Sequence, residues 1–351
     1  MTARYPRPSF PPLDTVKILC LLLFPAMLGA DSTPKVSSVD YYGLRKIPAN
    51  RIQKIVGVSA GDPLPPSKGD LEDRLEKIPG VVLARVEVVC CEGDRGMLFV
   101  GIEEKSAPHF ALRSAPTGTP TLPSAIVDSY HELVETLEAA GRRGSTEEDL
   151  TEGHPLAADP DSRAIQQNFV DFTAHHLAQI REVLRNSGDE EQRSMAATLI
   201  GYAPDKKAVV NDLEYALQDP DEGVRASAVR ALDAIAILAE KRPELGIQIP
   251  PTWLVEMLNS IVLSDRTEAT RALLNLTDSR PAAILDTLRE RALASLVEMA
   301  QWNSLRYALP AFILLGRAGD IDEQQIQERW ARGDREALIQ EVAKSSKKKR
   351  R

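Results

Sequence analysis

Hydrophobic and polar positions follow two different periods in two parts of the chain. Between Val82 and Cys90, and again between Leu98 and Ile102, apolar residues occupy every second position, which predicts two β-strands with one apolar face. From about residue 164 onward, apolar positions recur every three or four residues, as in amphipathic helices. The pattern predicts an α+β module followed by an all-α region.

The clearest helical unit runs from Asp219 to Ala236. Its apolar or small residues fall on one helix face: Val224, Ala228, Ala231, Leu232 and Ile235. The opposite face is expected to be polar and carries Arg225, Ser227, Arg230 and Asp233. Asp221 follows Pro220 and can accept the free amide hydrogens of the first turn, so a helix is expected to begin there.

Related patterns flank this unit on both sides. Residues 189–203 repeat it at an offset of 32, and residues 271–273 repeat it at an offset of 41. Second helices are predicted between these copies, at 207–218 and 252–263. A helix pair buries its faces only by stacking on neighbours, so the repeats predict an α-solenoid.

The unit resembles a HEAT or HEAT-like repeat, with its Asp-rich turn, its Val-Arg pair and its Ala/Leu-rich helix. The resemblance is good over residues 189–239 and extends loosely to 343. It implies a curved surface that holds other proteins. It also implies that Asp221, Arg193 and Arg225 bridge adjacent units and are structural.

The N-terminal module has the expected order β-α-α-β-β over residues 36–105. A strand is predicted at 36–42, helices at 48–55 and 68–78, and a hairpin from Val82 onward. The strand positions expected to point inward on the hairpin are Val82, Ala84, Val86, Val88 and Cys90, then Leu98, Val100 and Ile102. The two helices are expected to cover this apolar face.

With its landmarks at 57–64, 78–81 and 101–104, this order resembles a POTRA domain. The resemblance implies an envelope module that holds client chains by pairing a client strand to an open sheet edge. Only the holding function is carried over, because no membrane barrel or anchor accompanies the module. The predicted edge residues that contact a partner are Val36, Val39, Tyr41 and Tyr42.

Residues 106–163 are predicted to be a linker between the module and a HEAT-like solenoid at 164–343. Residues 106–123 hold four prolines and are expected to be a spacer. A helix is predicted near 124–140, and residues 141–162 are expected to form a loop or a disordered stretch.

The first 30 residues have the pattern of a secretory signal peptide. Arg4, Arg7 and Lys17 precede an apolar run at 18–28, and small residues at 29–30 suggest cleavage near Ala30. The expected location is therefore periplasmic or otherwise extracytoplasmic.

The formal net charge is −8, although six cations lie in the basic tail at 344–351. The tail residues Lys347, Lys348, Lys349, Arg350 and Arg351 are expected to contact an anionic surface. The alternative is a solubilising terminus.

Motifs for catalysis are weak. Residues 57–61 match G-x-S-x-G, but a helix precedes them and prolines follow, so a loop is favoured over a nucleophile. Cys90 and Cys91 are adjacent on a strand and point to opposite faces, which favours free thiols over a disulfide. His175 and His176 lack a zinc-site pattern. No cofactor, metal site or small-molecule substrate is predicted.

These features favour a non-catalytic, exported scaffold that binds proteins in the cell envelope. Two alternatives remain open. One is an enzyme or enzyme subunit built on HEAT-like repeats, as in the bilin lyases that the repeats resemble. The other is a cytosolic nucleic-acid binder that uses the basic tail, which requires that the first 30 residues do not direct export.

Overall fold

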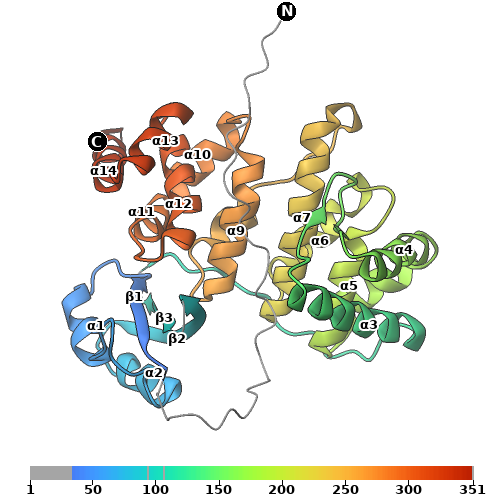
Figure 1. The fold of residues 1–351 in the computed structure, drawn as a ribbon, viewed down its shortest axis with the longest axis horizontal. Coiled ribbons are helices and arrows are strands. Elements are labelled where there is room, and N and C mark those ends of the chain that lie inside the picture. Colours follow the sequence, from blue (N-terminus) through green and yellow to red (C-terminus); the bar gives the residue numbers. More distant parts are fainter. Residues whose placement is uncertain (1–33, 93–94, 106, 350–351) are drawn as a thin grey trace, which may run out of the picture.

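The computed structural model describes residues 34–92, 95–105 and 107–349, and it consists of a small α/β module packed against a row of helices (Figure 1). The module has the predicted element order β-α-α-β-β. Its elements are β1 (Val36–Tyr42), α1 (Ala49–Val56), α2 (Lys68–Glu76), β2 (Val81–Glu92) and β3 (Arg95–Glu104). The strand order in the sheet is β1-β3-β2, with β1 parallel and β2 antiparallel to β3.

Local signals set the ends of the two module helices. Gly57 ends α1 with φ of 64°, a left-handed conformation that glycine adopts without a steric penalty. The Ser67 side chain caps α2 by accepting the Asp70 amide hydrogen. The two helices then bury Ile52, Leu71 and Leu75 against one face of the sheet.

The predicted inner face of the hairpin is partly wrong. Ala84 and Val86 are buried beneath the helices, but Val82 and Val88 are 54% and 38% exposed. A register irregularity between Val81 and Leu83 turns Val82 outward. Cys90 is exposed and disulfide-bonded, so the free thiol expected there is wrong.

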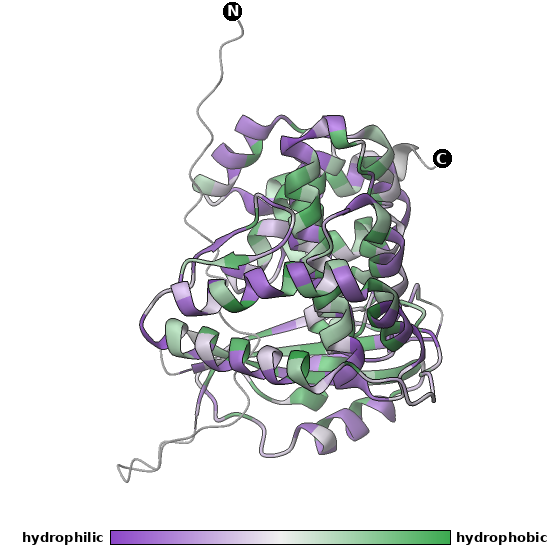
Figure 2. Cartoon of the chain, turned by 90° about the vertical axis from the view of Figure 1, so that its right-hand side faces the viewer, coloured by the Kyte–Doolittle hydropathy of each residue, from purple (hydrophilic) through white to green (hydrophobic). Residues whose placement is uncertain are grey.

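After the module, the described chain has a non-helical stretch at 107–123, and the rest is mostly helical with one small hairpin. Its first elements are α3 (Ser124–Arg142), the strands β4 (Glu148–Asp149) and β5 (Leu156–Ala157), α4 (Pro160–Asn186), α5 (Glu190–Gly201), α6 (Val210–Ala216) and α7 (Glu222–Lys241). Then come α8 (Thr252–Met257), α9 (Leu263–Leu276), α10 (Ala282–Arg291), α11 (Leu293–Ala300), α12 (Leu305–Ala318), α13 (Glu323–Ala331) and α14 (Arg335–Lys349). Figure 2 shows largely hydrophobic helices at the centre and hydrophilic segments around them.

Helices α5, α7, α9 and α12 stack in succession, as the repeat pattern predicted. Several boundaries differ from the expected ones. Helix α4 begins four residues earlier than 164, because Asp159 caps it. The predicted helix at 252–263 ends at Met257, and a turn separates it from α9.

Buried ion pairs connect successive repeats. Arg193 donates to Asp219 through Nε and Nη2, each at 2.9 Å, and Arg225 donates to Asp265 at 2.8 and 2.9 Å. Asp221 instead caps α7 by accepting the Val224 amide hydrogen. These residues are structural, as the HEAT-like pattern implied.

Part of the α7 face expected to be polar is buried. Arg225 is 1% exposed and Asp233 is 5% exposed, because the neighbouring repeats pack on both sides of the helix. Asp233 accepts a hydrogen bond from Asn275 of α9 at 2.6 Å. Burial raises the pKa of its carboxyl above the usual range.

The second face of the sheet packs on the helical repeats. Tyr42, Met97 and Phe99 belong to the same apolar core as the repeat helices, and both aromatic rings meet Trp302 edge-on. This cover was missed in the sequence, although Met97 to Val100 is apolar at every position. Such a run is typical of a strand buried on both faces.

The module also supplies hydrogen-bond acceptors for backbone amides of the repeats. Helix α9 begins at Leu263, and its N-cap residue Val262 has no side chain that can cap it. Glu87 of β2 accepts the Leu263 amide hydrogen at 3.1 Å instead. Asp40 of β1 accepts the Asn303 amide hydrogen at 2.7 Å, just before α12. The module and the repeats therefore complete each other's hydrogen bonding.

The segment predicted to be a spacer lies along the repeats. The backbone N–H of Arg113 donates to Gln218 at 2.9 Å, that of Gly118 donates to Asn186 at 2.9 Å, and that of Leu122 donates to the Gln192 side chain at 2.8 Å. These acceptors lie at the turns between paired helices or at the start of α5, so residues 107–123 form a strap along one edge of the array.

Residues 141–162 contain the short β4–β5 hairpin and pack on α5 and α7. Arg230 of α7 pairs with Glu148, and the Tyr202 hydroxyl donates to the Pro155 carbonyl at 3.0 Å. This segment therefore belongs to the folded helical part, which composition alone did not indicate.

Candidate functional site: a groove along the open sheet edge

The three-stranded sheet has two outer edges, and they differ in how they are covered. On β2, the backbone N–H groups of Ala84 and Val86 donate to the Glu76 and Glu72 carboxylates of α2, at 3.1 and 2.6 Å. These contacts occupy donors that an incoming strand would need. This part of the β2 edge is therefore protected by its own module, in the way natural sheets limit edge pairing.

The beginning of β1 is covered as well. Val36 donates to the Asp62 carbonyl at 2.8 Å and accepts from the Gly61 amide at 2.8 Å. Lys35 and Pro63 form an antiparallel bridge in the same place. The loop between α1 and α2 thus acts as a short strand along this part of the edge.

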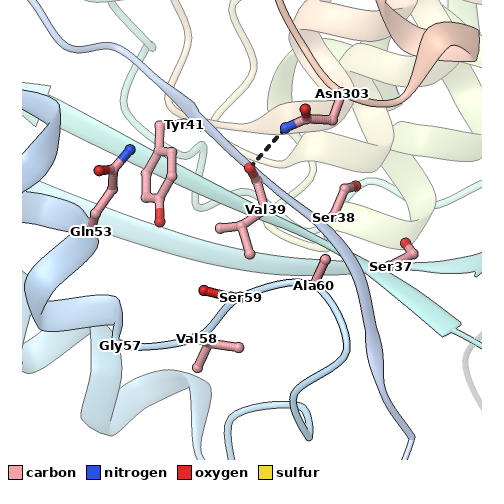
Figure 3. A pocket seen from close by; sticks show the side chains of 10 residues that line it. All are labelled: Ser37, Ser38, Val39, Tyr41, Gln53, Gly57, Val58, Ser59, Ala60 and Asn303. Atoms are coloured by element: carbon pink, nitrogen blue, oxygen red, sulfur yellow. Dashed lines mark hydrogen bonds between the residues drawn. The ribbon is translucent and has the colours of Figure 1, made fainter.

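Beyond Val36 the edge pairs with no strand of the described chain and borders a groove. The Val39 carbonyl points away from β3 and accepts from Asn303 Nδ2 at 3.2 Å (Figure 3). Since backbone groups alternate along a strand, Tyr41 also directs its N–H and C=O toward this edge. The open stretch lies within residues 37–42.

The groove beside this edge has a volume of about 450 Å³. Figure 3 shows Val39 and Tyr41 pointing toward the α1–α2 loop, with Asn303 on the opposite side of the strand. The residues that line it are Ser37, Ser38, Val39, Tyr41, Gln53, Gly57, Val58, Ser59, Ala60 and Asn303. Burial raises the pKa of the Tyr41 hydroxyl above its usual value, so the ring is neutral at physiological pH.

The four residues predicted to contact a partner are not equivalent in the structure. Val39 and Tyr41 line the groove. Val36 is fully buried in the module core, and its backbone pairs with the α1–α2 loop. Tyr42 is also fully buried, because its ring packs on the repeats and its hydroxyl donates to the Ile261 carbonyl at 2.8 Å.

Several groove residues were missed in the sequence. Residues 57–61 match a nucleophile motif, but Ser59 lies in a turn closed by Asp62, whose carboxylate accepts the Ser59 amide hydrogen. The loop reading is confirmed, and Gly57 to Ala60 form a wall of the groove. No local signal links Asn303 to β1, because more than 260 residues separate them.

A second cavity of about 250 Å³ lies beside Lys206. The Lys206 ammonium group donates to the Gly201 carbonyl at 2.7 Å, at the end of α5, and approaches His154 Nδ1 at 3.1 Å. Burial lowers the pKa of Lys206 to about 7 and that of His154 to about 4. The lysine caps a helix C-terminus, which is a structural role.

The two adjacent histidines considered in the sequence, His175 and His176, line neither cavity. His175 hydrogen-bonds the Asp171 carbonyl and His176 stacks on Phe172. The described residues hold no group of three or more metal-binding side chains. The tail side chains from Lys347 to Arg351 lie outside the described residues, as do residues 1–30, so the predictions made for them stay predictions.

Comparison with known protein families identifies a similarity in the helical part of the chain. A family model described as HEAT repeats matches residues 177–273. The matched segment is HEAT-like. In the structure the HEAT-like helices α5, α7 and α9 stack in one row, as expected of a helical scaffold for protein interactions.

No curated protein sequence matches the chain. Among solved structures, the crystal structure of an engineered protein is similar, with 18% identity over 54% of this chain and 92% of that chain. The TM-score is 0.36. Within the described residues, no helix has both the length and the apolar character needed to cross a bilayer.

Proposed function

We propose that this chain is an exported, non-catalytic scaffold that holds an extended segment of a partner protein beside β1. The observation that carries this proposal is the stretch of the β1 edge that pairs with no strand of the described chain and borders a groove, in a sheet whose other edge has the Ala84 and Val86 amides held by α2 carboxylates. A peptide that adds a strand there gains main-chain hydrogen bonds without disturbing the sheet.

The module supports the proposal through its resemblance to a POTRA domain. The observed order β-α-α-β-β, with β1 at an outer edge, agrees with that resemblance. The HEAT-like repeats would add a second surface for the same partner or for another protein. The signal-peptide pattern in residues 1–30 places the chain outside the cytosol in this proposal, and the basic tail would contact an anionic surface there.

The location is tested by fractionating cells that express a C-terminally tagged chain and sequencing the mature N-terminus. Export predicts an extracytoplasmic protein that begins at Asp31. A cytosolic protein that retains Met1 would refute export and would favour the nucleic-acid alternative.

Strand pairing is tested with two variants at one position. Tyr41→Pro removes an edge N–H, whereas Tyr41→Ala removes the same ring and keeps that donor. After crosslinking in cells, partner recovery should fall more with Tyr41→Pro than with Tyr41→Ala. Equal recovery from the two variants would contradict main-chain pairing at this edge.

A further inference from the structure

Buried polar atoms without a partner concentrate on β1 and on the segment just before α12, next to the groove. The described residues contain nine such side-chain atoms, and five of them belong to β1 or to the segment before α12. These five are Ser37 Oγ, Ser38 Oγ, Asp40 Oδ2, Trp302 Nε1 and Ser304 Oγ. Buried polar groups in native proteins nearly always have partners, so this concentration needs an explanation.

Two of these groups line the groove itself. Ser38 is 9% exposed, and both Ser37 and Ser38 belong to the lining of the groove. Their side chains lie on the same side of the strand as Asn303 and point away from the α1–α2 loop (Figure 3). A hydroxyl both donates and accepts one hydrogen bond readily. A ligand group that reaches them from the groove would satisfy both.

The groove is also free of charge. None of its ten lining residues is Asp, Glu, Lys, Arg or His. A charged side chain placed there would lose water without gaining an opposite charge, which is strongly unfavourable. The wall opposite Val39 is made of the small residues Gly57, Val58, Ser59 and Ala60, which leaves room for small side chains along the edge.

The length of the open edge limits the ligand. The α1–α2 loop already pairs with β1 up to Val36, and β1 ends at Tyr42. Six residues of extended chain span about 20 Å. A segment of about four to six residues therefore fills the open edge.

We infer that the groove selects a short extended segment with small, uncharged side chains, and that it places a hydroxyl-bearing residue of this segment against Ser37 and Ser38. This inference rests on the proposed function and names the chemical class of the partner. A backbone N–H of the segment replaces Asn303 Nδ2 at the Val39 carbonyl. Asn303 retains its second acceptor, Asp40 Oδ1, at 2.8 Å.

The test uses fluorescein-labelled hexapeptides with blocked ends and measures anisotropy with the full mature chain. The reference peptide alternates Val and Thr. In comparison peptides Thr is replaced by Ala, Lys or Glu, and one further peptide carries N-methylated backbone amides. We expect the Lys and Glu peptides to bind at least about tenfold more weakly than the Thr peptide, because each buried unpaired charge is costly.

The variant that tests the Ser38 contact is Ser38→Ala. Ser227→Ala on α7 is the control, because it removes the same hydroxyl group at a position outside the groove. Ser38→Ala should weaken the Thr peptide by about two- to tenfold, the range of one hydrogen bond, and leave the Ala peptide unchanged. Ser227→Ala should leave the affinity for both the Thr peptide and the Ala peptide unchanged. Circular dichroism confirms that each variant is folded.

The outcomes separate the inference from the proposed function. If all peptides except the N-methylated one bind alike, edge pairing stands and the selectivity inferred here is wrong. Tighter binding of the Lys or Glu peptide also overturns the selectivity. If no peptide binds, both the inference and strand addition at β1 are refuted.

Discussion

Replacing Arg225 with Met tests whether the buried ion pairs hold the repeats together. The Arg225 side chain donates to both Asp265 oxygens and, through Nη1, to the Asp219 and Pro220 carbonyls at 2.8 and 3.0 Å. Without it, Asp265 keeps only the Ser260 hydroxyl, at 2.6 Å, while it remains 2% exposed.

An uncompensated buried charge determines the expected size of the effect. Removing one partner of a buried pair destabilises a protein by about 3–5 kcal/mol. Replacing both partners, as in Arg225→Met with Asp265→Leu, should cost clearly less than the two single losses together, because no charge is then left buried.

The assay is urea unfolding followed by far-UV circular dichroism. A stability change should move the midpoint while the slope of free energy against urea stays the same. Arg242→Met is the control, because Arg242 and its partner Glu244 are 55% and 64% exposed, and an exposed pair contributes about 0–1 kcal/mol. A loss below about 1 kcal/mol for Arg225→Met, or strictly additive losses in the double variant, would refute the reasoning.

Three further predictions concern the module interface, pH and the protected edge. Glu87→Ala removes the side chain that accepts the Leu263 amide hydrogen and should lower the unfolding free energy by about 1 kcal/mol. Glu87→Gln keeps an acceptor and should lower the unfolding free energy less in the same urea assay. Burial raises the pKa of Glu214 from 4.5 to about 8, so the folded chain keeps a proton that the unfolded chain releases, and stability should fall as pH rises from 4.5 to 8. Glu214→Gln should flatten this dependence in urea midpoints, and an unchanged slope would exclude Glu214 as its source. Replacing both Glu72 and Glu76 with Ala frees the Ala84 and Val86 amides of β2 and should increase self-association, measured by sedimentation velocity. A sedimentation coefficient that does not change with rising protein concentration would show that these carboxylates do not prevent edge pairing.

Helix and strand identity could be predicted because their signals are local. The period-two pattern and the turns gave the β-α-α-β-β order, and Asp189 and Asp221 cap the two helices that the repeat pattern located. Periodicity could not distinguish a polar helix face open to water from one buried against a neighbour. The pattern placed Arg225 and Asp233 on the polar face, and the structure buries both of them.

Two of the four contact residues predicted from the sequence lie in the groove. Val39 and Tyr41 were expected at an open edge and line the groove, whereas Tyr42, on the same strand, is occupied by the repeats. An alternating pattern assigns residues to two faces but does not say what covers each face. Trp302 supplies that cover from a helix connection far along the chain.

By itself, the sequence determined the elements of this protein and their order, because propensity, capping and hydrophobic period act over a few residues. Only the tertiary structure decided which sheet edge stays open. Glu72 and Glu76 close the β2 edge from a neighbouring helix, while Asn303 reaches β1 across most of the chain. Such contacts depend on how finished elements pack, and no local pattern encodes them.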